Sequence, residues 1–493
     1  MSLINVSHLT FAYEGSCDNI FTDVSFQIDT AWKLGFCGRN GRGKTTFLKL
    51  LTGKYEYSGA ISASVNFSYF PFEVSNENKN TPDILSELAP EAKLWQIQKE
   101  LSKLAVNEDA LYRPFSTLSN GEQTKVLLAG LFLRENNFLL IDEPTNHLDM
   151  ASRQTVARYL KDKAGFILVS HDRAFLDECV DRILSINKTD IEIINGNFSA
   201  WFEQKRRRDA FEFSQNKRLE SEIGRLQQAA AQTADWSDKV EKSKREPLKS
   251  GLSPDRGFIG HKAAKMMKRS KAIEKRRNDS IEEKSALLKN IESAADLKIQ
   301  PLAYRAARLL SIEDLSVCYD SREIFRDLSF TLEQGERIAL QGGNGSGKSS
   351  IIKLICGENI PHTGRVNKGS GLIISYVPQD ASFLEGNLSN YAKEQQIDET
   401  LFKTILYKLD FSRVQFEKDM RGFSAGQKKK VLIARSLCGR AHVYIWDEPL
   451  NYIDALSRIQ IEELILTYKP TMIFVEHDKA FCDNIATKTV RIT

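Results

Sequence analysis

The hydrophobic and polar positions of this chain follow the same order twice. Apolar and polar residues alternate over residues 3–11 and again over residues 309–319, which predicts a half-buried strand at the start of each copy. Helix-forming stretches follow Gly-rich loops at residues 46–51 and 350–355. Continuous apolar runs, typical of parallel strands buried on both faces, occupy residues 138–141, 166–170, 443–446 and 472–476. The pattern therefore predicts an α/β fold built twice.

A different pattern separates the two copies. Residues 199–305 are rich in Lys, Arg, Glu, Gln and Ala, and contain two heptad-like apolar seams, at Leu219, Ile223, Leu226 and Ala230 and at Ile281, Leu288, Ile291 and Ala295. Two Pro and three Gly at residues 246–260 predict a turn. We expect a long antiparallel α-helical hairpin, in which about 40 residues at 1.5 Å each extend roughly 60 Å. The predicted domains are a first repeat at 1–198, this linker, and a second repeat at 306–493.

The composition favours an intracellular protein outside the membrane. The 41% hydrophobic content supports large cores, and no run approaches the roughly 18 apolar residues that span a bilayer. The N-terminus lacks the basic and apolar regions of a signal peptide. Seven cysteines without paired spacing predict neither a disulfide framework nor a zinc site. We expect a cytoplasmic monomer that does not bind a membrane.

Positive charge is concentrated in the linker. The whole chain has a net charge of +4, whereas residues 199–305 contain 25 Lys/Arg and 16 Asp/Glu. Residues 239–277 alone contain 14 basic and 4 acidic side chains. Such a localised basic segment predicts contact with a polyanion. A solvated helix face is the alternative, although so many like charges repel each other unless a polyanion compensates them.

Two Gly-rich loops, at residues 38–45 and 342–349, match the P-loop pattern. Each follows an apolar strand and leads into a helix, the context in which backbone N–H groups wrap phosphates. A single match can arise by chance, but two matches in the same context argue against it. The predicted nucleotide-binding residues are Gly38, Asn40, Gly41, Gly43, Lys44, Thr45 and Thr46, with Gly342, Asn344, Gly345, Gly347, Lys348, Ser349 and Ser350. In this pattern the lysines neutralise phosphate charge, and the hydroxyls of Thr45 and Ser349 bind Mg²⁺.

Acidic residues and a histidine follow the apolar runs in both repeats. An Asp ends the first run of each repeat, where a carboxylate binds Mg²⁺, and the next residue is a Glu that can take a proton from an attacking water. A His follows the second run and is expected to orient that water or the terminal phosphate. These residues are Asp142, Glu143 and His171 in the first repeat and Asp447, Glu448 and His477 in the second. An ordinary strand-end acid or a structural His is the alternative, and the duplication weighs against it.

A short Ser-x-Gly motif lies between the P-loop and the acidic pair of each repeat. Ser119 and Gly121 precede one helical stretch and Ser424 and Gly426 another, as is typical of a helix N-terminus that binds an anion. A Ser N-cap is common, so the motif gains weight from its place 75 or 76 residues after the P-loop lysine. Matching motifs lie 304 to 306 residues apart throughout, which indicates a duplicated nucleotide-binding domain.

Together these motifs resemble those of ATP-binding-cassette ATPases over almost the whole chain. The resemblance implies two cassettes packed head to tail around two ATP molecules with Mg²⁺. Each site would combine one P-loop with the Ser-x-Gly signature motif of the other repeat; the first site contains the P-loop of the first repeat, and the second site that of the second repeat. The residues assigned by resemblance alone are Tyr13 and Tyr319 (adenine stacking), Asp149 and Asp454 (D-loop) and Gln379 (Mg²⁺).

Two departures from the family pattern distinguish the sites. Phe72 stands where the second repeat has Gln379, so we expect the first site to hold Mg²⁺ less tightly. Asn120 and Ala425 each replace a signature glycine, which is expected to alter the fit to the terminal phosphate. We therefore expect the two sites to differ in activity.

Paired cassettes without membrane segments, joined by a long basic helical linker, resemble the ABC-F family of translation-acting ATPases. The sequence of residues 142–149 is close to the one typical of that family. Residues 38–46, 445–452 and 267–271 are similar to the corresponding sequences of the Lsa group of ribosomal-protection proteins. The resemblance implies binding to the bacterial 70S ribosome, with its 23S rRNA and P-site tRNA, by a linker that enters through the tRNA exit site. It further implies protection against lincosamides, streptogramin A and pleuromutilins.

The linker tip contains the side chains that we expect to bind the ribosome. Apolar residues at a hairpin tip have no core to fill, so we expect them to pack on unstacked bases or near the drug pocket, beside basic residues that contact phosphates. The set is Trp236, Leu248, Leu252, Phe258, Lys262, Lys265, Lys268 and Arg269. Stapling of the hairpin turn is the alternative for its apolar members.

Three other functions stay open on the sequence. One is a housekeeping translation factor of the same family, and another is the ATPase subunit of a drug exporter with a separate membrane partner. The linker charge argues against the exporter, because a membrane-coupling cassette needs no basic hairpin. The third is a DNA-repair or chromosome ATPase, a class in which the coiled coils are usually far longer.

Overall fold

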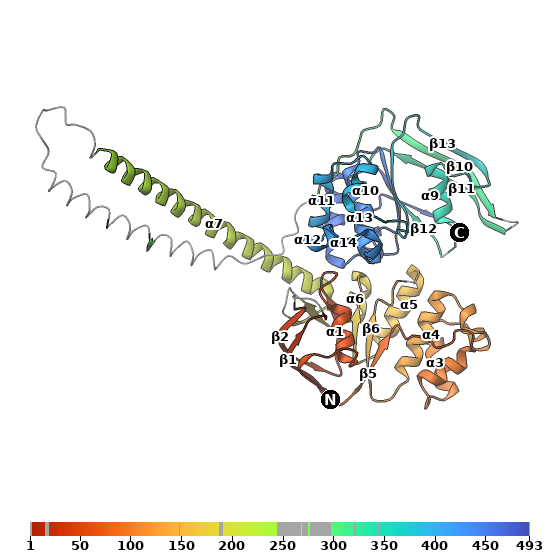
Figure 1. The fold of residues 1–493 in the computed structure, drawn as a ribbon. Helices are drawn as coiled ribbons and strands as arrows, with labels where there is room; N and C mark the ends of the chain where they lie inside the picture. The colour runs from red at the N-terminus through yellow and green to blue at the C-terminus, as the bar shows by residue number, and fades with distance from the viewer. Residues whose placement is uncertain are drawn as a thin grey trace, which may run out of the picture. The chain divides into compact units, whose positions relative to one another are not determined.

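The structure is a computed structural model of the chain (Figure 1). It describes residues 2–14, 19–146, 148–186, 191–243, 268, 275–276, 297–319, 322–343 and 345–492. Its contacts divide the chain into two compact units, Met1–Trp201 with Ala294–Thr493 and Phe202–Ser293. Both repeats therefore belong to one unit, and most of the linker forms the other.

Residues 294–305, which the sequence assigns to the linker, group with the larger unit. Leu297 and Ile299 are buried in the hydrophobic core of the second repeat. The backbone N–H of Leu302 donates to the carbonyl of Ala441 at 2.8 Å. These contacts, made by isolated apolar residues in an irregular segment, attach the end of the linker sequence to the second repeat.

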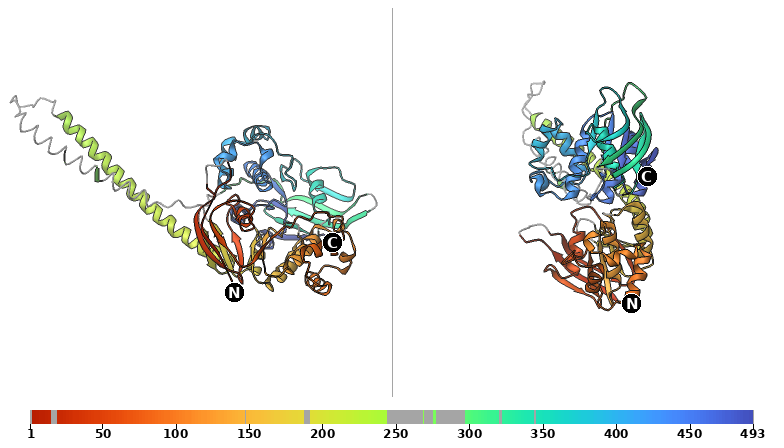
Figure 2. Two further views of the ribbon diagram at one scale, coloured as in Figure 1. Left: turned by 60° about the horizontal axis from the view of Figure 1, so that its bottom comes forward. Right: turned by 90° about the vertical axis from the view of Figure 1, so that its right-hand side faces the viewer.

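The first repeat contains a mainly parallel sheet and a smaller antiparallel sheet (Figures 1 and 2). Among the described residues, the larger sheet has the strand order β5-β6-β7-β3-β8-β9, in which only β8 and β9 pair antiparallel. The smaller sheet has the order β2-β1-β4. The strands are β1 (Leu3–Phe11), β2 (Phe21–Asp29), β3 (Lys33–Cys37), β4 (Ser58–Ser62), β5 (Asn66–Phe70), β6 (Asn137–Asp142), β7 (Phe166–Val169), β8 (Arg182–Ile186) and β9 (Ile191–Asn195).

Helix α1 (Lys44–Leu51) packs against both sheets and fixes the position of the first P-loop. Phe47 of α1 is fully buried, and its ring meets those of Phe21 and Phe36 edge to face at centroid distances of 6.0 and 5.6 Å. The helix begins two residues before the predicted start at residue 46, because the chain turns into the helix directly at Gly43.

The second repeat has the same two-sheet arrangement (Figure 2). Its larger sheet, with order β14-β15-β16-β12-β17 in the described part of the chain, is parallel throughout, and its smaller sheet has the order β11-β10-β13. The elements are β10 (Arg308–Tyr319), β11 (Arg322–Glu333), β12 (Arg337–Gln341), α9 (Lys348–Cys356), β13 (His362–Lys368), β14 (Ile374–Val377), β15 (Val443–Asp447), β16 (Met472–Val475) and β17 (Lys488–Arg491). The predicted α/β fold is therefore confirmed in both repeats.

Further helices flank the larger sheets and contain the signature motifs at their ends. In the first repeat, α2 and α3 pack against α4, which follows the signature motif, and in the second repeat α11 packs against α13. The helices are α2 (Thr81–Leu88), α3 (Leu94–Lys103), α4 (Asn120–Phe132), α5 (Met150–Lys161), α6 (Arg173–Cys179), α10 (Leu388–Glu394), α11 (Glu399–Lys408), α12 (Arg413–Phe416), α13 (Ala425–Cys438), α14 (Ala455–Tyr468) and α15 (Lys479–Ile485). Short 3₁₀ helices occupy Glu108–Tyr112, Phe115–Thr117 and Met420–Gly422.

The outgoing helix of the linker is α7 (Phe198–Ser243), 46 residues long. Ile223, one of the predicted seam residues, is buried. Lys268, Lys275 and Arg276 are helical, in agreement with a returning helix. The predicted turn at 246–260 lies outside the described residues.

Within the described part of the chain, no helix combines the length and the apolar character needed to span a membrane.

Candidate functional site

Each P-loop ends in a glycine that the fold requires. Gly43 and Gly347 cap α1 and α9 in the left-handed region, with φ of 90° and 89°. A Cβ on Gly43 would lie 2.4 Å from the side chain of Ile20, and a Cβ on Gly347 would lie 2.7 Å from the ring of Phe325. Only glycine fits at these positions, and the turn directs the N–H groups at the start of each helix toward the place where a phosphate binds.

The P-loop lysines are folded back over their own loops. The ammonium of Lys44 donates to the carbonyls of Gly38 and Arg39 at 2.7 and 3.2 Å. That of Lys348 donates to the carbonyls of Gly342 and Gly343 at 2.9 and 2.8 Å. Burial lowers the pKa of both lysines. A buried ammonium that donates to loop carbonyls beside a helix N-terminus suits the phosphate chain of a nucleotide.

The hydroxyl and carboxylate predicted to hold Mg²⁺ lie together in each repeat. Thr45 Oγ1 donates to Asp142 Oδ2 at 2.7 Å, and Tyr69 Oη donates to the same oxygen at 2.9 Å. In the second repeat Oδ1 of Asp447 is buried without a hydrogen-bond partner in the described part of the chain. Burial raises the pKa of Asp447, while a hydrogen bond from Ser349 lowers it. These oxygens fit Mg²⁺, which would supply positive charge against the phosphates when bound.

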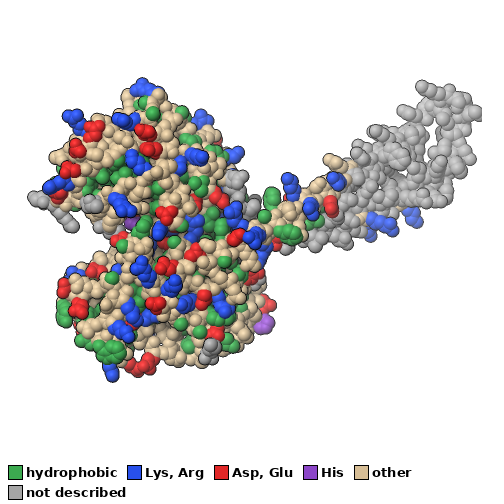
Figure 3. Space-filling view, turned by 180° about the vertical axis from the view of Figure 1, so that it is seen from behind, with side chains coloured by type: hydrophobic (Ala, Val, Ile, Leu, Met, Phe, Trp, Pro, Cys, Tyr) green, Lys and Arg blue, Asp and Glu red, His purple; other side chains and the backbone are tan. Residues whose placement is uncertain are grey.

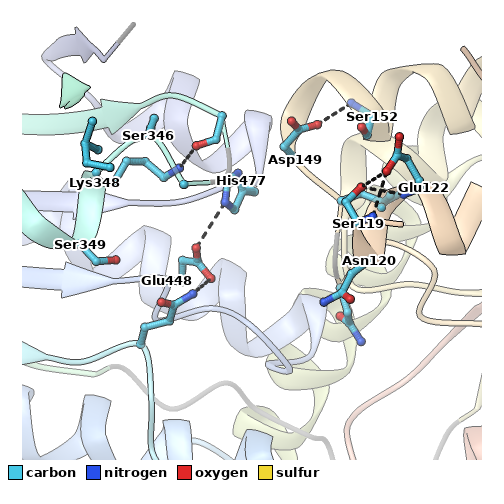
Figure 4. A pocket seen from close by; sticks show the side chains of 18 of the residues that line it. Ser119, Asn120, Glu122, Asp149, Ser152, Ser346, Lys348, Ser349, Glu448 and His477 are labelled. Atoms are coloured by element: carbon cyan, nitrogen blue, oxygen red, sulfur yellow. Dashed lines mark hydrogen bonds and ion pairs between the residues drawn. The ribbon is translucent and has the colours of Figure 1, made fainter. Parts of the chain in front are cut away.

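The candidate general bases stand at strained turns next to the predicted histidines. Glu143 and Glu448 have φ of 50° and 46°, in the left-handed region that residues other than glycine seldom adopt. His171 Nε2 lies 3.3 Å from Glu143 Oε1, and His477 Nε2 lies 3.4 Å from Glu448 Oε1. The His–Glu distances are thus similar in both repeats (Figure 4 shows the second pair), but Glu143 Oε1 is buried without a hydrogen-bond partner in the described part of the chain.

The surroundings of the two glutamates differ. Glu448 Oε2 accepts hydrogen bonds from Gln379 Nε2 at 2.9 Å and from Asn451 Nδ2 at 2.7 Å. Burial alone raises the pKa of Glu448, but hydrogen bonds from His477 and Gln379 outweigh it and lower the pKa to about 2. Burial raises the pKa of Glu143 to about 8, and the nearby charge of Asp142 adds to the rise.

Phe72 accounts for part of this difference. Sheet register pairs Phe70 with the strand residue before Asp142, and Val377 with the one before Asp447, so Phe72 and Gln379 occupy equivalent positions two residues later. A phenyl ring cannot donate the hydrogen bond that the amide of Gln379 gives. The first site therefore lacks one group that keeps the catalytic glutamate ionised.

We expect Glu448→Gln to remove a larger share of ATP turnover at neutral pH than Glu143→Gln. Glu448 is held ionised by hydrogen-bond donors, whereas the raised pKa of Glu143 leaves it mostly protonated below about 8. Because a general base must be deprotonated, the turnover that survives in Glu448→Gln should rise as pH increases through this value. Steady-state ATPase rates of both single variants across this pH range provide the measurement. If the two single variants hydrolyse ATP at equal rates with equal Mg²⁺ dependence, the two sites do not differ in activity.

A cavity of about 950 Å³ brings the first signature motif to the second P-loop. Ser119, Asn120, Gly121 and Glu122 line one side, and Asp149 and Asn146 lie beside them. The other side contains the second-site residues Gly343, Gly345, Gly347, Lys348, Ser349, Ser350, Gln379, Glu448 and His477, together with Tyr319 (Figure 4). The cavity thus brings together most of the residues that the family resemblance places in the second composite site, although Asp447 is not among its lining residues.

The second signature motif lies beside the first P-loop. Asn40 Nδ2 donates to the carbonyl of Tyr452 at 2.8 Å, and a Cβ on Gly426 would lie 2.4 Å from that carbonyl and 3.4 Å from Asn40 Nδ2. Asp454 acts electrostatically on both Lys44 and His171. A segment of the second repeat therefore contacts the first P-loop directly.

The signature serines cap their helices in capping boxes. Ser119 Oγ accepts from the N–H of Glu122 and Ser424 Oγ from the N–H of Gln427, both at 3.3 Å, and the Glu or Gln side chain bonds back. Each serine therefore marks the positive end of a helix of at least 13 residues, as an anion site requires.

The remaining predicted residues divide into described and undescribed ones. The rings of Tyr13 and Tyr319 are 43% and 40% exposed, and their hydroxyls hydrogen-bond Thr46 and Ser350 at 2.7 and 3.2 Å. Both rings therefore offer a free face above a P-loop helix for stacking. Of the predicted ribosome-binding residues, Lys268 is described and exposed. The other predicted ribosome-binding side chains lie outside the described residues; they are those of Trp236, Leu248, Leu252, Phe258, Lys262, Lys265 and Arg269. The same holds for Asn344 of the second P-loop.

Sequence reasoning missed two polar residues at the sites. Tyr69 reaches Asp142 because β5 lies beside β6, although 73 residues separate the two. Asn451 reaches Glu448 from three residues further along the chain. An Asn at this spacing in both repeats, Asn146 and Asn451, was the available signal for the second of them.

Comparison with known proteins agrees with this geometry. A family model described as ABC transporter matches residues 21–146 and 325–451, just over half of the chain. The chain is 29% identical to the ATP-binding protein Uup of Buchnera aphidicola subsp. Acyrthosiphon pisum, over 99% of this chain and 80% of that protein. It is 27% identical to the ribosome protection protein VmlR of Bacillus subtilis, over 98% and 85%. It is 25% identical to the energy-dependent translational throttle protein EttA of Haemophilus influenzae, over 95% and 88%.

A solved structure has the same fold. In the crystal structure of the complex of archaeal ribosomal stalk protein aP1 and archaeal ribosome recycling factor aABCE1, one chain matches with a TM-score of 0.61 at 18% identity. The match covers 98% of this chain and 87% of that chain. The tandem arrangement of two α/β nucleotide-binding domains is therefore confirmed.

Proposed function

The chain belongs to the ABC transporter family and is an ATPase, and on this premise we propose that it is an ABC-F protein that protects bacterial ribosomes from antibiotics. In this proposal, ATP with Mg²⁺ binds at both composite sites, and the linker enters the 70S ribosome through the tRNA exit site. The linker reaches 23S rRNA and the P-site tRNA near the peptidyl transferase centre. The protected drugs are lincosamides, streptogramin A and pleuromutilins, as in the Lsa group, and the protein acts as a cytoplasmic monomer.

The proposal depends on one observation, the long basic helical linker between two ATP sites. Residues 239–277 contain 14 basic and 4 acidic side chains, and α7 runs for 46 residues toward them. Figure 3 shows basic and hydrophobic side chains on the described part of the linker. The exposed ones on the first turns of α7 include Arg206, Arg207, Phe211, Phe213, Lys217 and Arg218. Basic side chains beside exposed aromatic rings suit RNA, which offers both phosphates and unstacked bases.

The likeness to VmlR supports the same conclusion, because it extends over nearly the whole of this chain, linker included. Within each site, Lys44 or Lys348 binds the phosphates, and Glu143 or Glu448 takes the proton of the attacking water. His171 or His477 lies beside that glutamate and orients the attacking water or the terminal phosphate. Hydrolysis would then separate the two repeats, and the protein would dissociate from the ribosome.

Binding to the ribosome is tested by neutralising the linker. We expect Lys262, Lys265, Lys268 and Arg269, all changed to Gln, to weaken co-sedimentation with ribosomes in ATP and flatten its salt dependence. Each lost phosphate contact removes close to one unit of the log–log slope. The ATPase rate of the isolated protein should be unchanged. The matched control changes four exposed lysines of the repeats, Lys54, Lys99, Lys393 and Lys418, to Gln and should keep the slope. An unchanged slope in the linker variant would mean that these residues form a solvated helix face.

A housekeeping translation factor is the second candidate, and the likeness to EttA favours it. The two candidates differ in one result. Expression in a sensitive bacterium should raise the inhibitory concentrations of a lincosamide and a pleuromutilin if the protein protects ribosomes. A protein that binds ribosomes and changes translation but leaves both concentrations unchanged is a housekeeping factor.

A further inference from the structure

The second repeat has two buried charges where the first repeat has hydroxyls. Five residues after the signature serine, the first repeat has Thr124 and the second has Lys429. Directly before the catalytic histidine, the first repeat has Ser170 and the second has Glu476. All four side chains are buried. An acid and a base thus replace a pair of neutral groups at two places that are far apart in sequence.

Lys429 holds the backbone on both sides of the second site. Its ammonium donates to the carbonyl of Pro378 at 3.0 Å and, more weakly, to that of Asp447 at 3.5 Å. These carbonyls belong to the residues directly before Gln379 and Glu448, whose side chains hydrogen-bond each other. One buried cation therefore joins the two chain segments that present the glutamine and the catalytic glutamate.

Glu476 holds two further segments of the same site. Its Oε1 accepts from the N–H of Leu450 at 2.7 Å, and its Oε2 accepts from the N–H of His477 at 3.2 Å. Leu450 directly precedes Asn451, which donates to Glu448. Burial disfavours the charge on both groups and lowers the pKa of Lys429, while the attraction of Glu476 opposes this.

The hydroxyls of the first repeat make different contacts. Thr124 Oγ1 donates to the carbonyl of Asn120 within its own helix at 2.9 Å. Ser170 Oγ lies 3.3 Å from Thr145 Oγ1 and accepts from the N–H of Asp172 at 3.2 Å. The bond of Thr124 stays within its own helix, whereas Ser170 joins the histidine turn to the acidic turn at Thr145, the counterpart of Leu450. In the second repeat Lys429 adds bonds from the signature helix to the glutamine loop and to the acidic turn.

We propose that Lys429 and Glu476 are positioning residues for ATP hydrolysis at the second site, a buried ionic frame that aligns Gln379, Glu448 and His477 before the substrate binds. Neither side chain touches the substrate; both act through the backbone next to the three catalytic groups. Pre-organised polar groups stabilise a transition state without the cost of reorganisation. This inference rests on the assignment of ATP hydrolysis to the second site and is independent of the ribosome.

The test uses the full chain with Glu143→Gln, so that turnover reports the second site. We expect Lys429→Met to lower kcat by about tenfold or more with little change in the KM for ATP, because catalytic alignment is lost and the P-loop is intact. The variant should also unfold at a lower temperature, since the carbonyls of Pro378 and Asp447 lose a buried donor and the attraction between Lys429 and Glu476 is removed. The control Lys393→Met removes an exposed lysine and should change neither kcat nor the unfolding temperature.

A second variant separates positioning from stability. Lys429→Thr with Glu476→Ser installs the hydroxyl pair of the first repeat and leaves neither charge unpaired. We expect its unfolding temperature to return toward that of the parent, while kcat stays low because nothing bridges Pro378 and Asp447. This variant also decides the question if Lys429→Met fails to fold. Recovery of kcat together with the unfolding temperature would overturn the proposal and make the pair merely structural. If the protein hydrolyses ATP but does not bind ribosomes, the proposed function is wrong, whereas the role of Lys429 and Glu476 in hydrolysis is unaffected.

Discussion

The double variant Glu143→Gln with Glu448→Gln should lose at least about 100-fold of ATP turnover, because a general base contributes a factor of this order or more. Each glutamate lies beside its histidine at 3.3 or 3.4 Å, at a strained turn directly after the Asp that is predicted to bind Mg²⁺. Gln has nearly the same shape and keeps the neighbouring hydrogen bonds, but it cannot accept a proton. ATP affinity, measured with a fluorescent analogue, should therefore be retained.

The same variant should remain on ribosomes in ATP, because the closed state cannot be released by hydrolysis. Sedimentation of the protein with ribosomes, with and without ATP, measures this retention. The control is Glu135→Gln with Glu417→Gln, two exposed glutamates of the repeats, and should hydrolyse ATP normally. Turnover near the parental rate in the double site variant would show that another group removes the proton.

Much of both sites could be predicted from the sequence because their chemistry is local. A P-loop, and an Asp-Glu pair after an apolar run, each specify their conformation within a few residues, and duplication repeats the evidence. Gly43, whose φ is 90°, illustrates this: the loop needs the residue that the motif supplies. The sequence also locates one difference at Phe72, and the strand registers of the two repeats place Phe72 and Gln379 at equivalent positions.

The features that the sequence did not predict depend on tertiary contacts, which the spacing of residues along the chain does not indicate. Tyr69 contacts Asp142 only because their strands are neighbours in the sheet. Lys429 reads as one more basic residue on a helix, yet its ammonium is buried between two loops. The predicted end of the linker, residue 305, differs from the structure for the same reason. Leu297 and Ile299 lie in a segment without helical or strand periodicity, so the sequence did not indicate that they join the core of the second repeat.

The largest stability effect should come from Asp454, and its counterpart Asp149 provides the matched comparison. Asp454 caps α14 by accepting from the N–H of Ser457 at 2.9 Å, and it pairs with the ammonium of Lys430 at 3.1 Å. The carboxylate is fully buried and the lysine nearly so. Asp149 caps α5 by accepting from the N–H of Ser152 at 2.8 Å, but it is only half-buried. Both aspartates are thus helix caps, and one is also half of a buried ion pair.

We expect Asp454→Ala to lower the free energy of unfolding by about 3–5 kcal/mol, because it leaves Lys430 buried without a counter-charge. Asp149→Ala should cost about 1 kcal/mol, the usual value for a lost cap. Asp454→Asn keeps an acceptor for the N–H of Ser457 but loses the charge and the acceptor for the Ser457 hydroxyl, so its loss measures the ion pair together with that hydrogen bond. Urea unfolding of the three variants, followed by the same probe, gives the comparison. Equal losses for Asp454→Ala and Asp149→Ala would show that the ion pair adds nothing to the cap.

The pH dependence of stability gives an independent check on the same pair. Burial raises the pKa of Asp454, but the attraction of Lys430 and His171 outweighs it and holds the pKa below its usual value. A carboxyl with a depressed folded-state pKa stabilises the protein above its unfolded pKa, near 4, and loses this contribution as pH falls below it. The parent should therefore lose stability more steeply than Asp454→Asn when pH is lowered from about 5 to 3. If stability falls equally with pH in both proteins, the charge of Asp454 does not contribute to stability through its pairing with Lys430.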